Sequence, residues 1–273
     1  MDKPITEIIR SYHPSLTMSE QKVADYVLDH PEEVMYFSVN NLADEAEVGE
    51  TTVLRFCKKV GVIGYQEFKL AIARHVAKKK HEKEDVSLKE HILHTTTESL
   101  QQTAAMVENE EVEQAIQAVL QAEHVHICGV GTSGITAMDA KSRFLRIGKS
   151  VEVWTDPHFQ AMAASSLNTG DVVIAISVSG STRDTLETVK IARENGASVI
   201  AVTYFSKSPI TEYADVVLIG GAQESPLEGG SMTAKICQLY VIDLICTGVA
   251  LEDKKTSAEM KERTADAVVN KIY

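Results

Sequence analysis

The sequence predicts two domains of different fold class, an all-α N-terminal domain and an α/β C-terminal domain with a doubly wound parallel sheet. Residues 17–80 show the spacing of consecutive helices, whereas from about residue 124 short β-branched runs alternate with helical stretches. The 273 residues suffice for two such domains. We therefore expect a helical domain over residues 1–80, a linker and connecting helix over 81–108, and the α/β domain over 109–273.

Polar residues mark the starts of the first helices. In "TMSEQKVADYVLDH", Thr17 is a predicted N-cap and Glu20 stands at the capping-box position. In "SVNNLADEA" a helix can start on Ser38, and "ETTVLRFCKKV" follows after a few residues with Gly61 as its stop. Two short helices joined by a tight turn indicate a helix-turn-helix.

The second helix of a helix-turn-helix lies in the DNA major groove. Apolar residues at 42, 43, 46, 48, 53 and 56 fall where the two helices must bury side chains against each other. The outward positions, and the predicted DNA-binding residues, are Glu50, Thr51, Thr52, Arg55, Lys58 and Lys59. Arg55 suits a guanine edge or a phosphate, and the two lysines suit phosphates. A generic helical hairpin with the same apolar spacing is the alternative interpretation.

The distribution of charge supports the first interpretation. The chain has a net charge of -12, yet residues 55–80 hold eight Lys or Arg against one Glu. A basic segment inside an acidic protein favours contact with nucleic acid at that segment. A solvated helical face would give the same composition.

The segment from His81, "HEKEDVSLKEH", is charged and lacks apolar periodicity, so we expect a linker there and a helix from near Ser87. "NEEVEQAIQAVLQA" predicts a second helix with Asn109 as its N-cap.

Five short runs then predict strands: "HVHICGV", "SVEVW", "DVVIAIS", "ASVIAVT" and "DVVLIG". Helical stretches between most of them indicate a parallel sheet with helices on both faces. The late apolar stretch "ICQLYVIDLICTGVA" is about 15 residues long and contains Asp243, which predicts a buried helix rather than a membrane span. No leader opens the chain, so we expect a cytoplasmic protein.

The four cysteines, Cys57, Cys128, Cys237 and Cys246, stand in apolar contexts without a C-x-x-C pair. This spacing predicts reduced core residues, and neither a metal site nor a disulfide framework.

The loop "SVSGST" follows the third predicted strand and precedes a helix. Ser177, Ser179, Ser181 and Thr182 bring four hydroxyls, and Gly180 allows the backbone to approach a ligand. A strand end that leads into a helix also offers free backbone N–H groups to an anion. The loop therefore predicts a phosphate cradle.

A second loop of the same sort, "GVGTSG", follows the first strand and contains Gly129, Gly131 and Ser133. With Gly134 the glycines also fit a dinucleotide-binding motif, which is the alternative. That motif needs an acidic residue at a strand end about 20 positions on, and Glu152 stands early in its strand instead. Two such loops fit a phosphate better than a nucleotide.

The blocks "TVLRFCKKVG" and "GYQEFKLAIA" resemble the N-terminal domain of RpiR/MurR-type bacterial transcription regulators, over nearly all of residues 1–78. Gly49 stands where that family usually has serine, and Glu47 occupies a turn position often held by glycine. The blocks "GVGTSG", "DVVIAISVSGST" and "SKSPITEYADVVL" resemble the SIS (sugar isomerase) domain, from about residue 109 to 250.

The resemblance implies a DNA-binding transcriptional regulator whose operator affinity is modulated by a sugar phosphate. It implies ligand contacts from the segment before the last helix, although Glu228 and Ala234–Lys235 depart from the arginine and Ser-Arg of the typical regulator. The predicted phosphosugar-binding residues are Ser133, Ser177, Ser179, Gly180, Thr182 and Glu224.

A sugar-phosphate isomerase or lyase is the alternative function. It needs a base and an acid, for which Glu224 and His158 are candidates by residue type alone. An isomerase has no use for a helix-turn-helix, so we favour a regulator with no catalytic residues, cofactor or metal. Because SIS domains generally pair, we expect a homo-oligomer, a dimer or tetramer, on a palindromic double-stranded operator, with no membrane partner.

Overall fold

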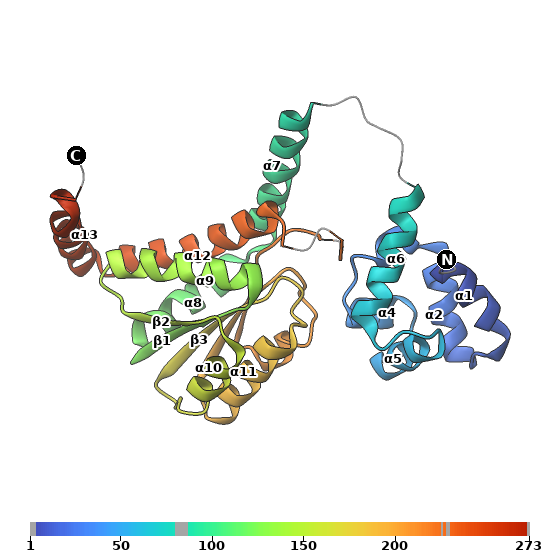
Figure 1. The fold of residues 1–273 in the computed structure, drawn as a ribbon. Coiled ribbons are helices and arrows are strands. Elements are labelled where there is room, and N and C mark those ends of the chain that lie inside the picture. The colour runs from blue at the N-terminus through green and yellow to red at the C-terminus, as the bar shows by residue number, and fades with distance from the viewer. Residues whose placement is uncertain (1–3, 80–86, 225, 228–229, 272–273) are drawn as a thin grey trace. The chain divides into compact units, whose positions relative to one another are not determined.

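Residues 4–79, 87–224, 226–227 and 230–271 are described by the computed structural model (Figure 1). The chain divides into two units, Met1–His91 with Gln223–Ser231, and Ile92–Ala222 with Met232–Tyr273. Each unit has a hydrophobic core of its own. The start of the predicted linker, residues 81–86, lies outside the described residues, as does Glu228.

The first unit is helical, as the sequence predicts. Two of the predicted helix starts are confirmed: Thr17 and Glu20 form a reciprocal capping box, and the hydroxyl of Ser38 accepts from the backbone N–H of Asn41. The helices are α1 (Ile5–Tyr12), the 3-10 turn η1 (His13–Ser15), α2 (Met18–Asp29), α3 (Pro31–Val34), α4 (Val39–Glu45), α5 (Glu50–Lys59) and α6 (Tyr65–Lys79). Phe56 of α5 and Phe68 of α6 meet edge to face in the core, with ring centroids 5.6 Å apart.

The turn between α4 and α5 depends on Glu47. Its φ of 52° lies in the left-handed region, which explains why glycine often holds this position. The carboxylate of Glu47 forms an exposed ion pair with Lys22 of α2 at 3.0 Å. The backbone N–H of the next residue, Val48, returns to the carbonyl of Ala43 and closes the turn.

The second unit contains the predicted alternation of strands and helices. Its helices are α7 (Leu88–Met106), α8 (Asn109–Gln121), α9 (Gly131–Arg146), α10 (Pro157–Ala164), α11 (Arg183–Glu194), the turn η2 (Thr211–Tyr213), α12 (Met232–Glu252) and α13 (Lys254–Val269). The strands are β1 (His124–Cys128), β2 (Val151–Trp154), β3 (Asp171–Ile176), β4 (Ser198–Thr203) and β5 (Val216–Ile219). The prediction of Asn109 as N-cap is wrong by one position, because Glu108 holds the cap position with extended backbone and Asn109 is already helical.

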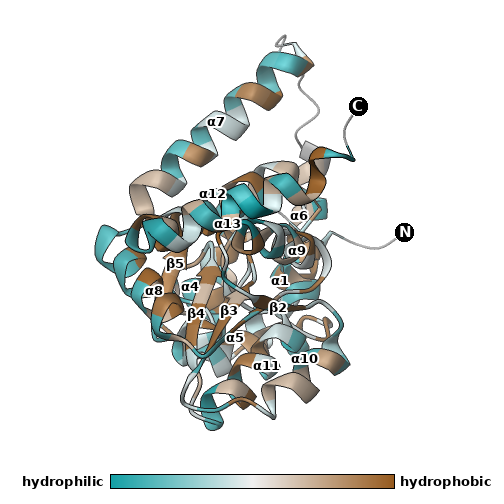
Figure 2. Ribbon diagram, turned by 90° about the vertical axis from the view of Figure 1, so that its left-hand side faces the viewer, coloured by the Kyte–Doolittle hydropathy of each residue, from teal (hydrophilic) through white to brown (hydrophobic). Residues whose placement is uncertain are grey.

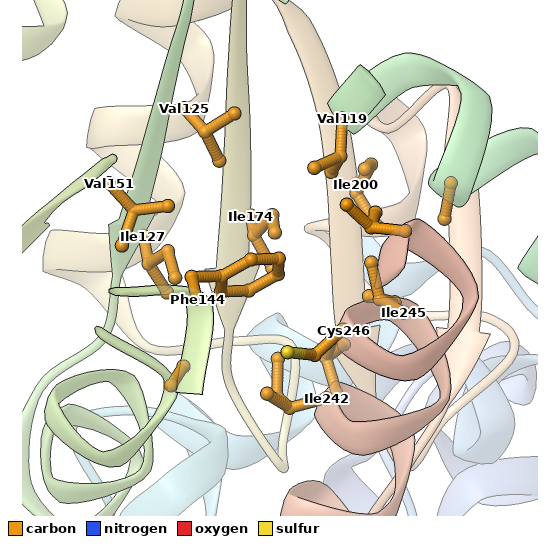
Figure 3. Packing of buried hydrophobic residues seen from close by; sticks show 14 of the residues in the cluster. Val119, Val125, Ile127, Phe144, Val151, Ile174, Ile200, Ile242, Ile245 and Cys246 are labelled. Carbon is orange, nitrogen blue, oxygen red and sulfur yellow. The ribbon is translucent and has the colours of Figure 1, made fainter. Parts of the chain in front are cut away.

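The described strands form one parallel sheet in the order β2-β1-β3-β4-β5. Side chains alternate between its two faces. Ile127 and Ile174 face a core shared with α8, α9 and α12 (Figure 3), whereas Cys128 and Ala175 face α10 and α11. The central strands β3 and β4 are brown in Figure 2, and β3 is buried at every position. The doubly wound parallel fold is therefore confirmed.

The connections leave β1 and β3 in opposite directions. After β1 the chain enters α9 on one face of the sheet, and after β3 it enters α11 on the other face. Because β1 and β3 are neighbours, their carboxyl ends form the switch point at which parallel α/β sheets bind ligands.

The long helix α12 belongs to the core of the second unit. With 21 residues it is long and apolar enough to span a membrane, and it is longer than the apolar run that the sequence suggested. Half of its most apolar stretch is buried, and Val241 belongs to the same core. Ile242 and Ile245 pack against the sheet (Figure 3). This burial is typical of a core helix.

The left-handed turn generates a prediction. Glu47→Ala and Glu47→Gly both remove the ion pair with Lys22, but only alanine keeps a Cβ in the left-handed conformation. We expect the alanine variant to be less stable than the glycine variant by about 1 kcal/mol. Hydrogen exchange of the α4 and α5 amides measures the difference, and equal protection in the two variants would contradict the role of the turn.

Candidate functional site

The outward face of α5 is the candidate nucleic-acid interface. Thr51, Arg55 and Lys58 are exposed, while Val53 and Phe56 are fully buried on the opposite face. The prediction that Thr52 points outward is wrong. Thr52 is 7% exposed, and its hydroxyl accepts from the guanidinium of Arg55 at 3.3 Å. Thr52 therefore helps to hold the Arg55 side chain in place.

Lys59 is exposed, but its ammonium is tied to a buried carboxylate. Its ammonium donates to Oε2 of Glu20 at 2.6 Å, and that carboxylate is almost fully buried at the start of α2. Burial alone would raise the pKa of Glu20, but the hydrogen bonds from Lys59 and Thr17 outweigh it and lower the pKa. Lys59 therefore joins the last turn of α5 to the first turn of α2, whatever further contact it makes.

Two more features of this face were not evident from the pattern. The carboxylate of Glu50 accepts from the side-chain amide of Asn40 at 2.6 Å, which ties the start of α5 to α4. Leu54 is exposed between the polar positions and offers an apolar contact. Within the basic segment, Lys69 is buried and its pKa falls to about 8 because of that burial, so it adds nothing to the exposed charge.

The candidate ligand site lies at the carboxyl ends of β1 and β3. Among the described residues, no side chain caps the N-terminus of α9 or of α11. The neighbouring α10 differs, because Asp156 accepts from the N–H groups of His158 and Phe159. A carboxylate thus already occupies the positive end of α10, whereas no side chain caps those of α9 and α11, and such helix ends are suited to an anion.

The loop after β3 gathers the predicted hydroxyls. Ser177 and Thr182 lie with their oxygens 3.1 Å apart, and Ser179 accepts from the backbone N–H of Ser181 at 3.2 Å. The hydroxyl of Ser179 acts there as an acceptor, and no hydrogen bond among the described residues uses its proton. Gly180 has a φ of 59°, and a Cβ at this position would lie 2.0 Å from Oγ of Ser208. No other residue type fits this turn without a shift of its neighbours.

The loop after β1 lies against the end of β3. A Cβ on Gly129 would stand 3.1 Å from the carbonyl oxygen of Ile176 and 3.0 Å from the backbone of Ser133. The glycine therefore allows the two loops to approach each other. Ser133 is buried in the first turn of α9, and the structure thus brings it to the same edge of the sheet as Ser177.

Two buried glutamines fasten this edge and were missed by the sequence reasoning. Gln160 of α10 donates to the carbonyls of Gly129 and Trp154, and its oxygen accepts from Thr188 of α11. Gln238 of α12 donates to the hydroxyl of Ser133 at 3.2 Å. For Gln238 the sequence did hold a signal: it is a glutamine inside the apolar sequence "ICQLYVIDLI", and a buried amide requires polar partners.

The remaining predicted residues lie elsewhere. His158 is exposed in the first turn of α10. Glu224 lies in the segment Gln223–Ser231 of the first unit, where its carboxylate accepts from the backbone N–H groups of Ser231 at 2.7 Å and Gly230 at 3.3 Å. Glu152 is the exposed second residue of β2, so the carboxylate of the dinucleotide alternative is not at a strand end.

The cysteines are buried free thiols, as predicted. Burial raises the pKa of Cys57 and of Cys128 to about 12, so that neither is reactive at neutral pH. Over the described part of the chain, no group of three or more His, Cys, Asp or Glu side chains is arranged to hold a metal ion.

Comparison with known families gives two matches. Residues 3–79 match the sequence model of the helix-turn-helix domain of the rpiR family, and residues 118–248 match that of the SIS domain. The two matched segments contain α5 and the cradle, respectively.

Several relatives match over nearly the whole chain. An uncharacterized HTH-type transcriptional regulator of Haemophilus influenzae is 34% identical over 273 residues, which covers 96% of this chain and 95% of its own. The HTH-type transcriptional regulator HexR of Pseudomonas aeruginosa is 34% identical over 257 residues, with 91% and 90% covered. The Vibrio vulnificus NanR protein, solved in complex with ManNAc-6P, superposes with a TM-score of 0.91 at 27% identity and covers 98% of this chain and 100% of that one.

The pair between Glu20 and Lys59 generates a prediction. Lys59→Met leaves the buried carboxylate without its ammonium, and we expect the free energy of unfolding to fall by about 1–2 kcal/mol. The loss is smaller than for a fully buried pair because Lys59 is partly exposed. Amide NMR resonances of α2 and α5, followed through a urea titration, measure the loss. Lys58→Met is the matched control and should cost less than about 0.5 kcal/mol.

The same pair has a defined pH dependence. The pKa of Glu20 is lowered in the folded chain. Its contribution to the free energy of unfolding is therefore present above the ordinary carboxyl pKa and is lost as the pH falls through the lowered value. The difference between wild type and Lys59→Met should therefore shrink in acid. A difference that stays constant with pH would show that packing, not charge, holds Lys59.

Proposed function

Because this chain belongs to the rpiR family of helix-turn-helix transcriptional regulators with a SIS domain, we propose that a sugar phosphate in the cradle changes its affinity for operator DNA. One observation carries the proposal. Two helix N-termini without a side-chain cap, α9 and α11, start at neighbouring strand ends and are surrounded by hydroxyls. Such an arrangement is suited to a phosphate dianion, which needs donors and positive dipole ends.

The ligand contacts that we propose are those predicted from the sequence. Ser177, Ser179 and Thr182 donate from the loop after β3, and Ser133 donates from the loop after β1. Gly180 allows the backbone to approach the ligand, while its own N–H donates to the carbonyl of Ser177 at 3.0 Å. Glu224 is proposed as a contact to the sugar. The complex of NanR with ManNAc-6P supports an aminosugar phosphate as the first compound to test.

We propose that the chain alters DNA binding and does not turn the sugar over. An isomerase needs a base and an acid directed at adjacent carbons of the substrate. His158, the candidate acid, is exposed on α10, and the oxygens of Glu224 are engaged by backbone N–H groups. Neither arrangement favours proton abstraction from carbon.

We also propose a homodimer in the cytoplasm that binds a palindromic operator. Helix α9 exposes Ile135, Met138 and Leu145, apolar side chains with more than half of their surface in solvent. An apolar stripe along one helix favours burial against a second copy. Two copies would present two α5 helices to two half-sites.

The DNA proposal is tested on Arg55. Arg55→Ala removes a guanidinium from the exposed face of α5, and we expect specific operator affinity to fall more than about tenfold. Arg10→Ala, which removes an exposed cation from α1, is the matched control and should change affinity less than about threefold. Fluorescence anisotropy with operator and scrambled DNA measures the affinity of each variant. Equal losses for the two variants would contradict the proposal that α5 lies in the major groove.

The cradle is tested on Ser179. A hydrogen bond to a phosphate contributes about 1.5–3 kcal/mol, so Ser179→Ala should weaken the sugar phosphate about tenfold to a hundredfold. Ser165→Ala, an exposed hydroxyl at the end of α10, is the control. Isothermal titration of phosphorylated and free sugar on each variant measures the affinities. Equal affinities throughout would show that the loop after β3 does not bind the phosphate.

The same samples report on catalysis. A ³¹P NMR time course of the bound sugar phosphate should show one unchanged species. Turnover beyond one equivalent would favour the isomerase instead.

A further inference from the structure

A chain of buried polar side chains runs from the core to Ser133. The hydroxyl of Thr136 donates to Oε1 of Gln238 at 3.0 Å, and Nε2 of Gln238 donates to Oγ of Ser133 at 3.2 Å. Thr136 is fully buried, Gln238 is 1% exposed and Ser133 is 7% exposed. Thr136 and Ser133 lie on α9 and Gln238 on α12, so the chain joins two helices on one face of the sheet.

The orientation of the Gln238 amide sets the direction of each hydrogen bond. With its oxygen toward Thr136, the single threonine proton is donated to Oε1 at 3.0 Å, a shorter contact than the 3.5 Å from the same hydroxyl to the carbonyl of Thr132. The amide nitrogen can only donate, so Ser133 can only accept from it. The proton of Ser133 then has no acceptor among the described residues, and it remains for a group outside the chain.

From this we propose that Gln238 is a positioning residue that holds Ser133 as a hydrogen-bond donor toward the phosphate. The proposal rests on the proposed function, because it requires an anion in the cradle. Gln238 does not itself touch the ligand. Because the amide nitrogen of Gln238 donates to Ser133, the serine cannot donate its own proton to Gln238.

The surroundings of Gln238 explain why a glutamine is needed. Its neighbours on α12, Cys237, Val241 and Ile242, are buried and apolar. A buried amide in such a setting is unfavourable unless both of its ends are paired. A leucine or methionine would fill the space without this cost, but it would leave the orientation of the Ser133 hydroxyl undetermined.

Two substitutions separate positioning from packing. In Gln238→Glu, the ionised carboxylate accepts from both Thr136 and Ser133, so the serine proton turns away from the phosphate. Gln238→Met keeps the volume and removes both hydrogen bonds. With inorganic phosphate as the probe at about pH 8, we expect the glutamate variant to bind about tenfold to a hundredfold more weakly and the methionine variant less than about threefold more weakly.

The pH profile gives a readout that packing does not produce. Burial favours the neutral form of a carboxyl group, and a neutral carboxyl can again donate to Ser133. The ratio of the Kd of Gln238→Glu to that of wild type should therefore fall toward one between about pH 8 and about pH 5.5. The ratio cancels the titration of phosphate itself. A ratio that does not change with pH would overturn the proposal.

A third variant keeps the proposal testable if Gln238→Glu fails to fold. Thr136→Val has nearly the same shape but no hydroxyl, so the amide of Gln238 is free to reverse and to accept the serine proton. We expect phosphate to bind about threefold to tenfold more weakly. An unchanged Kd in Thr136→Val would overturn the proposal.

The control is Ser257→Ala, which removes a buried hydroxyl directed at the carbonyl of Ile147, at the opposite end of α9. It should lower the melting temperature and leave the phosphate Kd unchanged, as read from ³¹P line widths at constant ionic strength. Equal, pH-independent losses in Gln238→Glu and Gln238→Met would show that Gln238 only braces the core. If wild type binds no phosphate, the proposed function itself fails, and this result is distinct from a failure of Gln238.

Discussion

The neighbouring strands β1 and β3 send the chain to opposite faces of the sheet, and the rest of the second unit is arranged around this constraint. Helices α9 and α11 therefore begin after neighbouring strand ends, and neither has a side-chain cap. Gly129 and Gly180 allow the backbone to approach closely there. Gln160 of α10 then holds the carbonyl of Gly129, and Gln238 of α12 holds the hydroxyl of Ser133. Neither helix directly follows β1 or β3.

The helical unit depends in a similar way on a buried polar group. Glu20 caps α2 and at the same time receives Lys59 from the end of α5. Helix α5, which we propose faces DNA, is therefore held by charge at its end, by Asn40 at its start and by Phe56 in its middle. Its side chains divide between those that hold the helix and those that remain exposed.

Local patterns predicted the elements well, because caps and periodicity depend on neighbours in sequence. The five strands, the caps at Thr17 and Ser38, and the hydroxyl loop after β3 all follow from short stretches. Partners distant in sequence were not predictable, since Glu20 and Lys59 are 39 positions apart and Ser133 and Gln238 are 105 apart. Periodicity also misplaced Thr52, because it lies at the border of the buried face, where a hydroxyl bonded to Arg55 is as well satisfied as one in water.

The uncapped N-termini of α9 and α11 have a consequence for how such a protein can diverge. Backbone N–H groups are the same whatever side chain a residue carries, so mutation cannot easily remove the part of the cradle that they provide. Side chains around the two loops are free to vary without loss of these N–H groups. In the function that we propose, a lineage built on this sheet can therefore exchange one phosphorylated metabolite for another through a few substitutions around the loops, while the backbone donors are inherited unchanged.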